Sequence, residues 1–260
     1  MGKHDVQPTE DDDGITAFFS PTESRRFKRR VVRFEVDDCS SIELKRKIMS
    51  RDPDLAIVRI PTHRLDIINH LFRVFTNVLL GDCLVMYSID LKRIQRRTDP
   101  SSTGLKLVRA NRKHLTDLDV VVRDSFHGYR NHYCHNPSLE QFDLTPAYQE
   151  WARSCVVSPD NTCFLFFKDE TLCGFFAAQT TGTVYRGLLS GVARKFRNIG
   201  TFRMIIKSIK SVFMSDGAHR IVTFVLLENR PVHRVLSSEG FRMGGSFYTA
   251  HINLRVPKDT

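Results

Sequence analysis

The stretch Ser190-Gly191-Val192-Ala193-Arg194-Lys195-Phe196-Arg197-Asn198-Ile199-Gly200-Thr201-Phe202 decides how this chain folds. It reads as the end of a strand, a short basic loop, and a helix whose apolar residues recur every three or four positions up to Phe213. The loop cations Arg194, Lys195 and Arg197 precede the helix start, where free N–H groups and the positive dipole end favour a pyrophosphate. An ordinary strand–loop–helix connection with solvated charges explains the stretch equally well.

The rest of the C-terminal part alternates strands and helices in a fixed order. The predicted strands are 105–109, 163–168, 172–181, 184–192, 220–227 and 246–254; the predicted helices are 112–125, 138–154 (broken near Pro146), 199–213 and 231–238. A turn at Asp169-Glu170-Thr171 joins two strands as a hairpin, and Gly240 ends the last helix. The pattern predicts an α/β fold.

Four short motifs in this part resemble the GNAT superfamily of acyl-CoA-dependent N-acyltransferases. They are Gly191-Val192, Arg197-x-x-Gly200, Glu228-Asn229-Arg230-Pro231 and Glu239-Gly240-Phe241. The resemblance covers about residues 105–255. It implies a mixed, mostly antiparallel central sheet flanked by helices.

The same resemblance implies a site for acetyl-CoA, the acyl donor. The strand ending at Val192 would splay from its neighbour and pair with the pantetheine arm, and the amides of 197–202 would hold the pyrophosphate. The implied cofactor-binding residues are Gly191, Val192, Arg197, Asn198, Ile199, Gly200, Thr201, Phe202 and Asn229. The implied reaction is direct attack of an amine on the thioester, with a backbone N–H near Val192 polarising the carbonyl.

A closer resemblance concerns the segment 126–137, Phe-His-Gly-Tyr-Arg-Asn-His-Tyr-Cys-His-Asn-Pro. It is similar to a loop of bacterial amino-sugar N-acetyltransferases of the TDP-fucosamine type, and 57–87 is similar to their small N-terminal α/β domain. This resemblance implies that Tyr129, His132 and Tyr133 bind the substrate, a primary amine on a nucleotide-linked sugar. The histidines there could instead hold a metal, but their spacing matches no standard ligand pattern.

Two residues depart from the family where acid–base chemistry is expected. Leu236 stands where many members have a tyrosine, and Arg186 stands near the place of a glutamate. Leucine cannot donate a proton and arginine stays protonated, so the catalytic residues remain unknown. Possible substitutes are Tyr185, Ser237, His132 and Tyr248. Asn198 and Phe202 also replace smaller residues and narrow the approach of a pyrophosphate.

Charge and composition leave several functions open. The chain has 39 Lys+Arg against 29 Asp+Glu, a net charge of +10, which attracts CoA and nucleotide sugars and also fits nucleic acid. Nucleic-acid binding is disfavoured because no signature of a nucleic-acid-binding module appears. Acylation of a peptide or another small amine, and a GNAT-like binding protein with impaired catalysis, remain as alternatives. A homodimer is compatible with the sequence.

The sequence also suggests how the chain is divided. We predict a disordered leader over 1–14, a small N-terminal α/β domain over 15–97, a linker over 98–104 and the acyltransferase domain over 105–255. The basic run Arg25–Arg30 is interpreted as a solvated strand edge, with a membrane surface or nucleic acid as alternatives. The six cysteines lack paired spacing, and no long apolar run or signal peptide appears, which predicts a cytoplasmic protein with reduced thiols.

Overall fold

The computed structural model describes residues 9–10, 14–94 and 103–255. Internal contacts divide the chain into two compact units that interleave along the sequence. The first unit comprises residues 1–84, 130–142 and 245–260, and the second comprises 85–129 and 143–244. The predicted linker 98–104 lies mostly outside the described residues, as do residues 1–8 and 11–13 of the predicted leader. The domain boundaries drawn from the sequence therefore stay a prediction.

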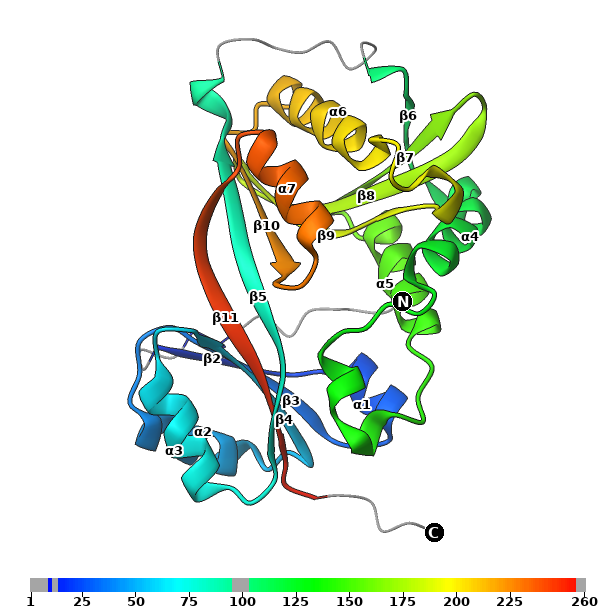
Figure 1. The fold of residues 1–260 in the computed structure, drawn as a ribbon. Coiled ribbons are helices and arrows are strands. Elements are labelled where there is room, and N and C mark those ends of the chain that lie inside the picture. The colour runs from blue at the N-terminus through cyan, green and yellow to red at the C-terminus, as the bar shows by residue number, and fades with distance from the viewer. Residues whose placement is uncertain (1–8, 11–13, 95–102, 256–260) are drawn as a thin grey trace. The chain divides into compact units, whose positions relative to one another are not determined.

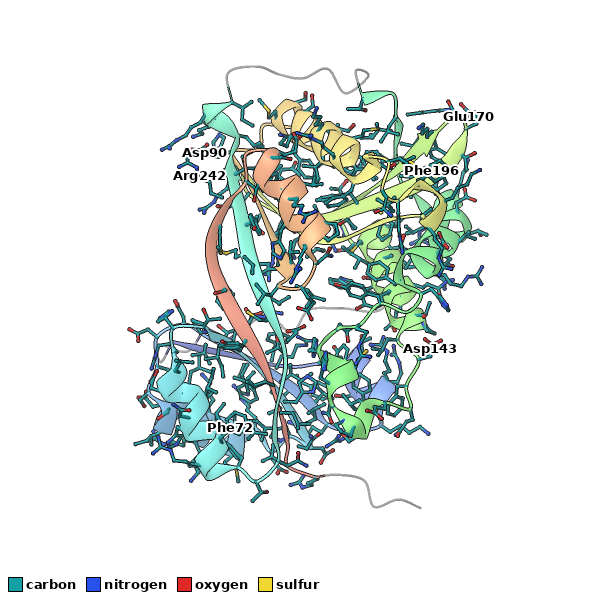
Figure 2. The ribbon with its side chains drawn as sticks, viewed as in Figure 1. Phe72, Asp90, Asp143, Glu170, Phe196 and Arg242 are labelled. Atoms are coloured by element: carbon teal, nitrogen blue, oxygen red, sulfur yellow. The ribbon has the colours of Figure 1, made fainter. Side chains whose placement is uncertain are left out.

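The second unit is built on a sheet in which antiparallel pairs dominate. Its strand order is β5-β10-β9-β8-β7-β6, with the bounds β5 (Val78–Asp90), β6 (Lys106–Arg109), β7 (Asn161–Lys168), β8 (Thr171–Thr181), β9 (Val184–Val192) and β10 (Arg220–Leu226). Strands β6 to β9 pair antiparallel, whereas β9 and β10 are parallel. The turn between β7 and β8, where Glu170 lies (Figure 2), closes the predicted hairpin.

Helices cover both faces of this sheet (Figure 1). They are α4 (Leu115–Phe126), α5 (Thr145–Val157), α6 (Thr201–Ser215) and α7 (Arg230–Ser238). Adjacent residues of β8 show the two faces, because Phe175 packs in the core formed with α4 and α5 while Phe176 packs in the core formed with α6 and α7. The predicted mixed, mostly antiparallel sheet flanked by helices is confirmed.

One predicted helix begins in the wrong place. The sequence pattern suggested a helix over 138–154, but a 3-10 turn covers Pro137–Leu139 and α5 begins only at Thr145. Proline at the start of α5 explains the difference. Pro146 has no N–H to donate and a fixed φ, so it is favoured in the first turn of a helix and unfavourable in its middle.

The first unit is a smaller α/β structure. Its strand order is β1-β2-β3-β4-β11-β5, with the bounds β1 (Thr9–Glu10), β2 (Ile15–Phe19), β3 (Val31–Val36), β4 (Leu55–Pro61) and β11 (Arg242–Asn253). Its helices are α1 (Pro21–Phe27), α2 (Ser41–Arg51) and α3 (Leu65–Val74). One face of this sheet is apolar and forms a core that also contains Leu44 and Ile48 of α2 and Ile67 and Leu71 of α3. The opposite face carries polar residues.

The run Arg25–Arg30 is solvated at Arg25, Lys28 and Arg30, as predicted, but it is not a strand edge. The run covers the end of α1 and the turn before β3, and Arg29 within it is only 5% exposed. The Arg29 guanidinium donates to the side chains of Ser138 and Asn253 at 2.8 and 3.1 Å, and to the carbonyl of Asp54. Arg29 is therefore part of the interior of the first unit, where it ties together three distant segments of the chain.

All six cysteines are free thiols. Burial raises the pKa of the Cys155 and Cys173 thiols to about 11 and that of Cys163 to about 12. These three groups therefore stay protonated near neutral pH and are poor nucleophiles. In the part of the chain that the structure describes, no helix has the length and apolarity needed to cross a membrane.

Candidate functional site

Strands β9 and β10 separate partway along their length. Their parallel pairing runs from Val184 opposite Arg220 to Gly187 opposite Thr223, whereas β9 continues to pair with β8 as far as Val192. A bulge lies where the separation begins, since Gly187 faces Ala178 and Leu189 faces Ala177, which leaves Leu188 as an extra residue. A bulge bends a strand and increases its twist, which accounts for the separation. A splay at this place is what the GNAT resemblance implied.

The predicted cofactor residue Gly191 lies on β9 beyond this bulge. A Cβ at this position would lie 2.6 Å from the Ser125 side chain and 2.8 Å from the ring of Phe175. Glycine is therefore required so that the end of α4 can approach β9 closely. The next residue, Val192, accepts a hydrogen bond on its carbonyl from Arg197 Nε at 3.1 Å.

The loop after β9 is fixed to the end of α4. The Arg197 guanidinium donates to the carbonyls of Ser125 and Asp124 at 2.8 and 3.3 Å, and the N–H of Arg194 donates to the Asp124 carboxylate. The Arg197 side chain thus holds the loop in place. The backbone N–H of Arg197 also donates to the Arg194 carbonyl, at 3.2 Å. A role for Arg197 in binding a cofactor therefore stays a prediction.

Two loop residues have left-handed backbone. Asn198 has φ 63° and Gly200, the residue before α6, has φ 86°. Glycine adopts this conformation without a steric penalty, and asparagine tolerates it better than most other residues. Asn198 therefore suits the loop despite replacing a common glycine. A Cβ at Gly200 would meet no atom within 4 Å, so its surroundings are open.

The start of α6 has backbone donors without an acceptor in the helix. The N–H groups of Thr201, Phe202 and Arg203 have no acceptor within the helix, because their partners would precede it, and Gly200 supplies no side-chain cap. The Thr201 hydroxyl is buried and has no hydrogen-bond partner among the described residues. Ile199 is exposed, and Phe202 is half-buried against the core of the second unit. The backbone N–H groups here can bind an anion such as a phosphate.

The two residues that depart from the family have different environments. Leu236 is 1% exposed within the core of the second unit, so it supplies packing and no proton donor. Arg186 is exposed on β9, with its guanidinium 5.0 Å from the centre of the Phe224 ring on β10. Asn229, the last predicted cofactor residue, is half-buried immediately before α7.

A tyrosine–histidine pair near the end of β10 was not predicted. His233 on α7 bonds the Leu226 carbonyl through Nε2 at 3.0 Å and the Tyr87 hydroxyl through Nδ1 at 3.1 Å. A carbonyl can only accept, so Nε2 carries the proton and Tyr87 donates to Nδ1. His233 lies three positions before Leu236, on the same side of the helix, which is the signal in the sequence that could have drawn attention to it.

The other possible acid–base residues are dispersed. Tyr185 is buried, with its ring 4.1 Å from that of Phe213, and Ser237 is exposed on α7. Tyr248 belongs to the first unit, as does His132. No pair of acid and base follows from these positions.

The predicted substrate residues fall into different units. Tyr129 belongs to the second unit, where its ring meets those of Phe126 and Tyr148 edge-on. His132 and Tyr133 belong to the first unit, where their rings lie 3.9 Å apart.

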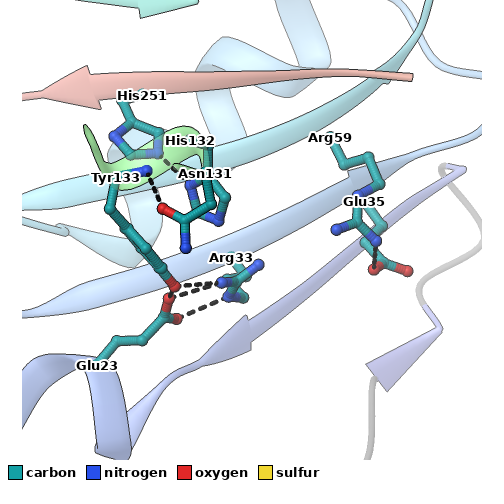
Figure 3. Close-up of polar contacts among 8 residues, drawn as sticks. All are labelled: Glu23, Arg33, Glu35, Arg59, Asn131, His132, Tyr133 and His251. Carbon is teal, nitrogen blue, oxygen red and sulfur yellow. Dashed lines mark hydrogen bonds and ion pairs between the residues drawn. The ribbon is translucent and has the colours of Figure 1, made fainter. Parts of the chain in front are cut away.

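Tyr133 joins a buried ion pair (Figure 3). Arg33 binds Glu23 through Nε and Nη2 at 2.7 and 2.6 Å, and the Tyr133 hydroxyl accepts from Arg33 at 2.8 Å and donates to Glu23. Burial alone would raise the pKa of Glu23, but the Arg33 guanidinium holds it below its usual value. Tyr133 is therefore fully engaged by protein groups.

His132 contacts a second histidine, also drawn in Figure 3. His132 Nδ1 lies 2.7 Å from His251 Nε2, and Asn136 Nδ2 lies 3.0 Å from His251 Nδ1. Burial lowers the pKa of His132 well below its usual value and that of His251 to about 3. Both rings are therefore neutral near pH 7. Within the described ranges, no group of three or more His, Cys, Asp or Glu side chains is placed to hold a metal ion.

Comparison with known proteins gives matches in structure. No family sequence model matches the chain, and no curated protein sequence matches it. A functionally unknown conserved protein from Staphylococcus epidermidis ATCC 12228 is similar, with a TM-score of 0.65 and 11% identity over 95% of this chain and 93% of that one.

Two solved structures described as GCN5-related N-acetyltransferases are also similar. The one from Sphaerobacter thermophilus has a TM-score of 0.63 and 12% identity over 95% of this chain and 79% of that one. The one from Kribbella flavida has a TM-score of 0.59 and 10% identity, with 95% and 88% covered. The chain thus has the fold of the GCN5-related N-acetyltransferases.

Proposed function

We propose that this protein is an acyl-CoA-dependent N-acyltransferase with acetyl-CoA as donor. The observation that carries the proposal is the splay of β9 from β10 after Gly187 and Thr223, followed by the left-handed loop and the open start of α6. The separated strands offer backbone groups to an extended amide-containing arm, and the helix start offers N–H groups to its pyrophosphate. The unpartnered Thr201 hydroxyl adds a donor at the same place.

In the proposed reaction, the acceptor amine attacks the thioester carbonyl carbon. A C–N bond forms, the C–S bond breaks, the amine loses a proton and the departing thiolate gains one. Backbone N–H groups of β9 beyond Gly187 would polarise the carbonyl, and the chain's main contribution would be to hold the two reactants together. The chain forms no covalent intermediate in this scheme.

The finer assignments are proposals as well. By the resemblance of 126–137, we propose a primary amine on a nucleotide-linked amino sugar as acceptor, a peptide or another small amine being the alternative. The buried Leu236 favours one further candidate, a GNAT-like protein that binds acyl-CoA but turns it over poorly. A cytoplasmic location and a homodimer remain predictions from the sequence.

Two glycines at opposite ends of α6 give a matched test. Gly200 and Gly217 both have left-handed backbone, at φ 86° and 82°, and a Cβ at either would meet no atom within 4 Å. Both Gly→Ala variants carry similar backbone strain, roughly 1–2 kcal/mol. We expect Gly200→Ala to weaken acetyl-CoA binding at least tenfold by calorimetry, and Gly217→Ala to leave the affinity within twofold.

Calorimetry of the native protein with acetyl-CoA, CoA and a longer acyl-CoA precedes these variants. Micromolar binding that Gly200→Ala weakens supports the site, and release of free thiol with amino sugars then separates an enzyme from a binding protein. An absence of binding at millimolar acetyl-CoA, or an equal loss in the two glycine variants, would contradict the proposal.

A further inference from the structure

The polar face of the first unit carries a row of side chains across three strands. Glu35 on β3 lies opposite Arg59 on β4, and Arg59 lies opposite Thr249 on β11. Residues paired in this way share one face of a sheet with Cβ atoms about 5 Å apart. The neighbouring positions Phe34, Val58 and Ala250 face the apolar core instead, so the row belongs to the opposite face.

The side chains of this row differ in how completely their polar atoms are hydrogen-bonded. The Thr249 side chain is 1% exposed, and its hydroxyl has no hydrogen-bond partner in the described parts of the chain. A buried unpartnered hydroxyl is costly, so it points to a missing partner. Arg59 contacts Glu35 at 3.3 Å, and Figure 3 shows this pair apart from the Arg33–Glu23 pair. The Glu35 side chain is 46% exposed, which makes the ion pair weak and easy to exchange.

The contact between His132 and His251 places another hydrogen-bond donor on this face. Because the Asn136 amide nitrogen can only donate, His251 accepts on Nδ1 and donates from Nε2 to His132 Nδ1. The neutral His132 therefore carries its own proton on Nε2. This atom has no protein partner among the residues described and is not among their buried unpartnered atoms.

Glycine allows His132 to lie directly on the sheet. A Cβ at Gly81 on β5 would lie 2.7 Å from the His132 Cβ, so any other residue would displace the histidine. His251, which His132 contacts, is two residues from Thr249 on the same face of β11, a separation of roughly 7 Å. Burial is the main cause of the lowered pKa of His132, and the positive charges of Arg33 and Arg59 on the same face contribute to it.

We propose that Arg59, Thr249 and His132 form a binding site for an oxyanion, either a carboxylate or a phosphate, on a small-molecule ligand. All three groups offer hydrogen-bond donors, and an oxyanion is the ligand that accepts several donors at once. The ligand takes the place of Glu35 on Arg59 and supplies the acceptor that the Thr249 hydroxyl lacks. This proposal concerns the first unit alone and does not depend on acyl transfer.

The test is a titration of the full chain, labelled with ¹⁵N at histidine, with inorganic phosphate and separately with acetate. The imidazole ¹⁵N signals report the tautomers directly, and we expect Nε2–H forms for both His132 and His251. We expect the His132 Nε2 signal to shift saturably at millimolar anion. A response to phosphate alone identifies a phosphorylated ligand, and a response to acetate alone identifies a carboxylate.

Variants separate this site from general attraction of anions to a basic protein. Arg59→Gln and Arg153→Gln each remove one positive charge from an ion pair, with Glu35 and Asp119 respectively. We expect Arg59→Gln and Thr249→Val to weaken the response roughly tenfold or more, the effect of losing a hydrogen bond to a charged group. Arg153→Gln should leave it unchanged, and Thr249→Ser should retain it.

Glu35→Gln gives a result in the opposite direction. It removes the competing carboxylate while keeping the shape of the side chain, so anion affinity should rise severalfold. Amide spectra of each variant show whether the fold is kept. A His132 signal that stays unmoved in both native protein and Glu35→Gln, or an equal weakening in Arg59→Gln and Arg153→Gln, would overturn the site.

Discussion

Asn198 shows how one residue can depart from a family pattern without disturbing the fold. Its φ of 63° lies in the left-handed region, where a β-branched side chain is strongly disfavoured and asparagine is tolerated. The preference for glycine at this position therefore has a backbone cause. Phe202 differs from Asn198 in this respect, because it lies within α6 and its side chain packs on the core.

Substitutions at Asn198 test this cause. We expect Asn198→Gly to change the free energy of unfolding by less than about 0.5 kcal/mol, and Asn198→Val to lower it by roughly 1–3 kcal/mol. Urea unfolding followed by circular dichroism measures both. Equal stabilities of the glycine and valine variants would show that the loop relaxes out of the left-handed conformation.

Glu239 is the second informative residue. Its carboxylate binds Arg203 at 2.7 Å and Lys210 at 2.8 Å and joins the end of α7 to α6. Burial alone would raise the Glu239 pKa, but the hydrogen bonds from Arg203 and Lys210 bring it below its ordinary 4.5. A lowered folded-state pKa adds stability that is complete above 4.5 and is lost as the pH falls through the folded value.

We expect Glu239→Gln to lower the free energy of unfolding by about 2–3 kcal/mol at pH 7, because it leaves Lys210, whose side chain is only 13% exposed, without its counter-charge. The difference from native protein should shrink below pH 4.5, the ordinary Glu239 pKa. Glu170→Gln is the control, since its pair with Lys106 is largely exposed and should contribute under about 1 kcal/mol. Urea unfolding across this pH range measures both, and a pH-independent difference for Glu239→Gln would refute the linkage.

At the scale of elements, the bulge in β9 explains how two parallel strands separate. The extra residue Leu188 lies where pairing with β10 stops, so the bend and the separation coincide. The strand before the bulge stays in the sheet, and the strand after it reaches the loop that begins at Ala193. A local irregularity of the ladder thus marks the place where the two strands separate.

Deletion of Leu188 should restore a regular ladder between β8 and β9 and reduce the splay. We expect the variant to fold, because the pairs on either side of the bulge keep their alternation, and to lose acetyl-CoA binding at least tenfold. Calorimetry and circular dichroism together measure this outcome. A folded deletion variant with native affinity would show that the bulge does not control the opening.

At the scale of the whole molecule, the interleaving of the units limits where the chain can be cut. In the first unit, β11 lies between β4 and β5, and Asn253 accepts from the buried Arg29. A fragment of residues 1–104 therefore lacks an interior strand of its own sheet, the strand that lies between β4 and β5. We expect this fragment to unfold without a cooperative transition, and a peptide of residues 242–255 to restore one. A sharp unfolding transition of the fragment alone would contradict this.

The sequence was most informative where structure is local. The strand ending at Val192 and the helix after Gly200 were predictable because spacing alone distinguishes them. The helix over 41–51 was missed although Ser40 and Glu43 form a capping box that can be recognised in the sequence.

The polar contacts of the first unit could not be predicted. Tyr133 meets Glu23, and His132 meets His251, across more than 100 residues of chain. No local pattern encodes such a partner. The Tyr87–His233 contact likewise joins residues that lie 146 positions apart in the sequence.

The position of β11 also determines when the first unit can be completed during protein synthesis. About 180 residues separate the end of β4 from the start of β11, the strand with which β4 pairs. At typical ribosomal speeds that interval lasts roughly 10–40 s. During that time the edge of β4 that β11 later covers has emerged without its partner. An unpaired strand edge is a template for pairing with other chains, so β4 carries that hazard until β11 is made.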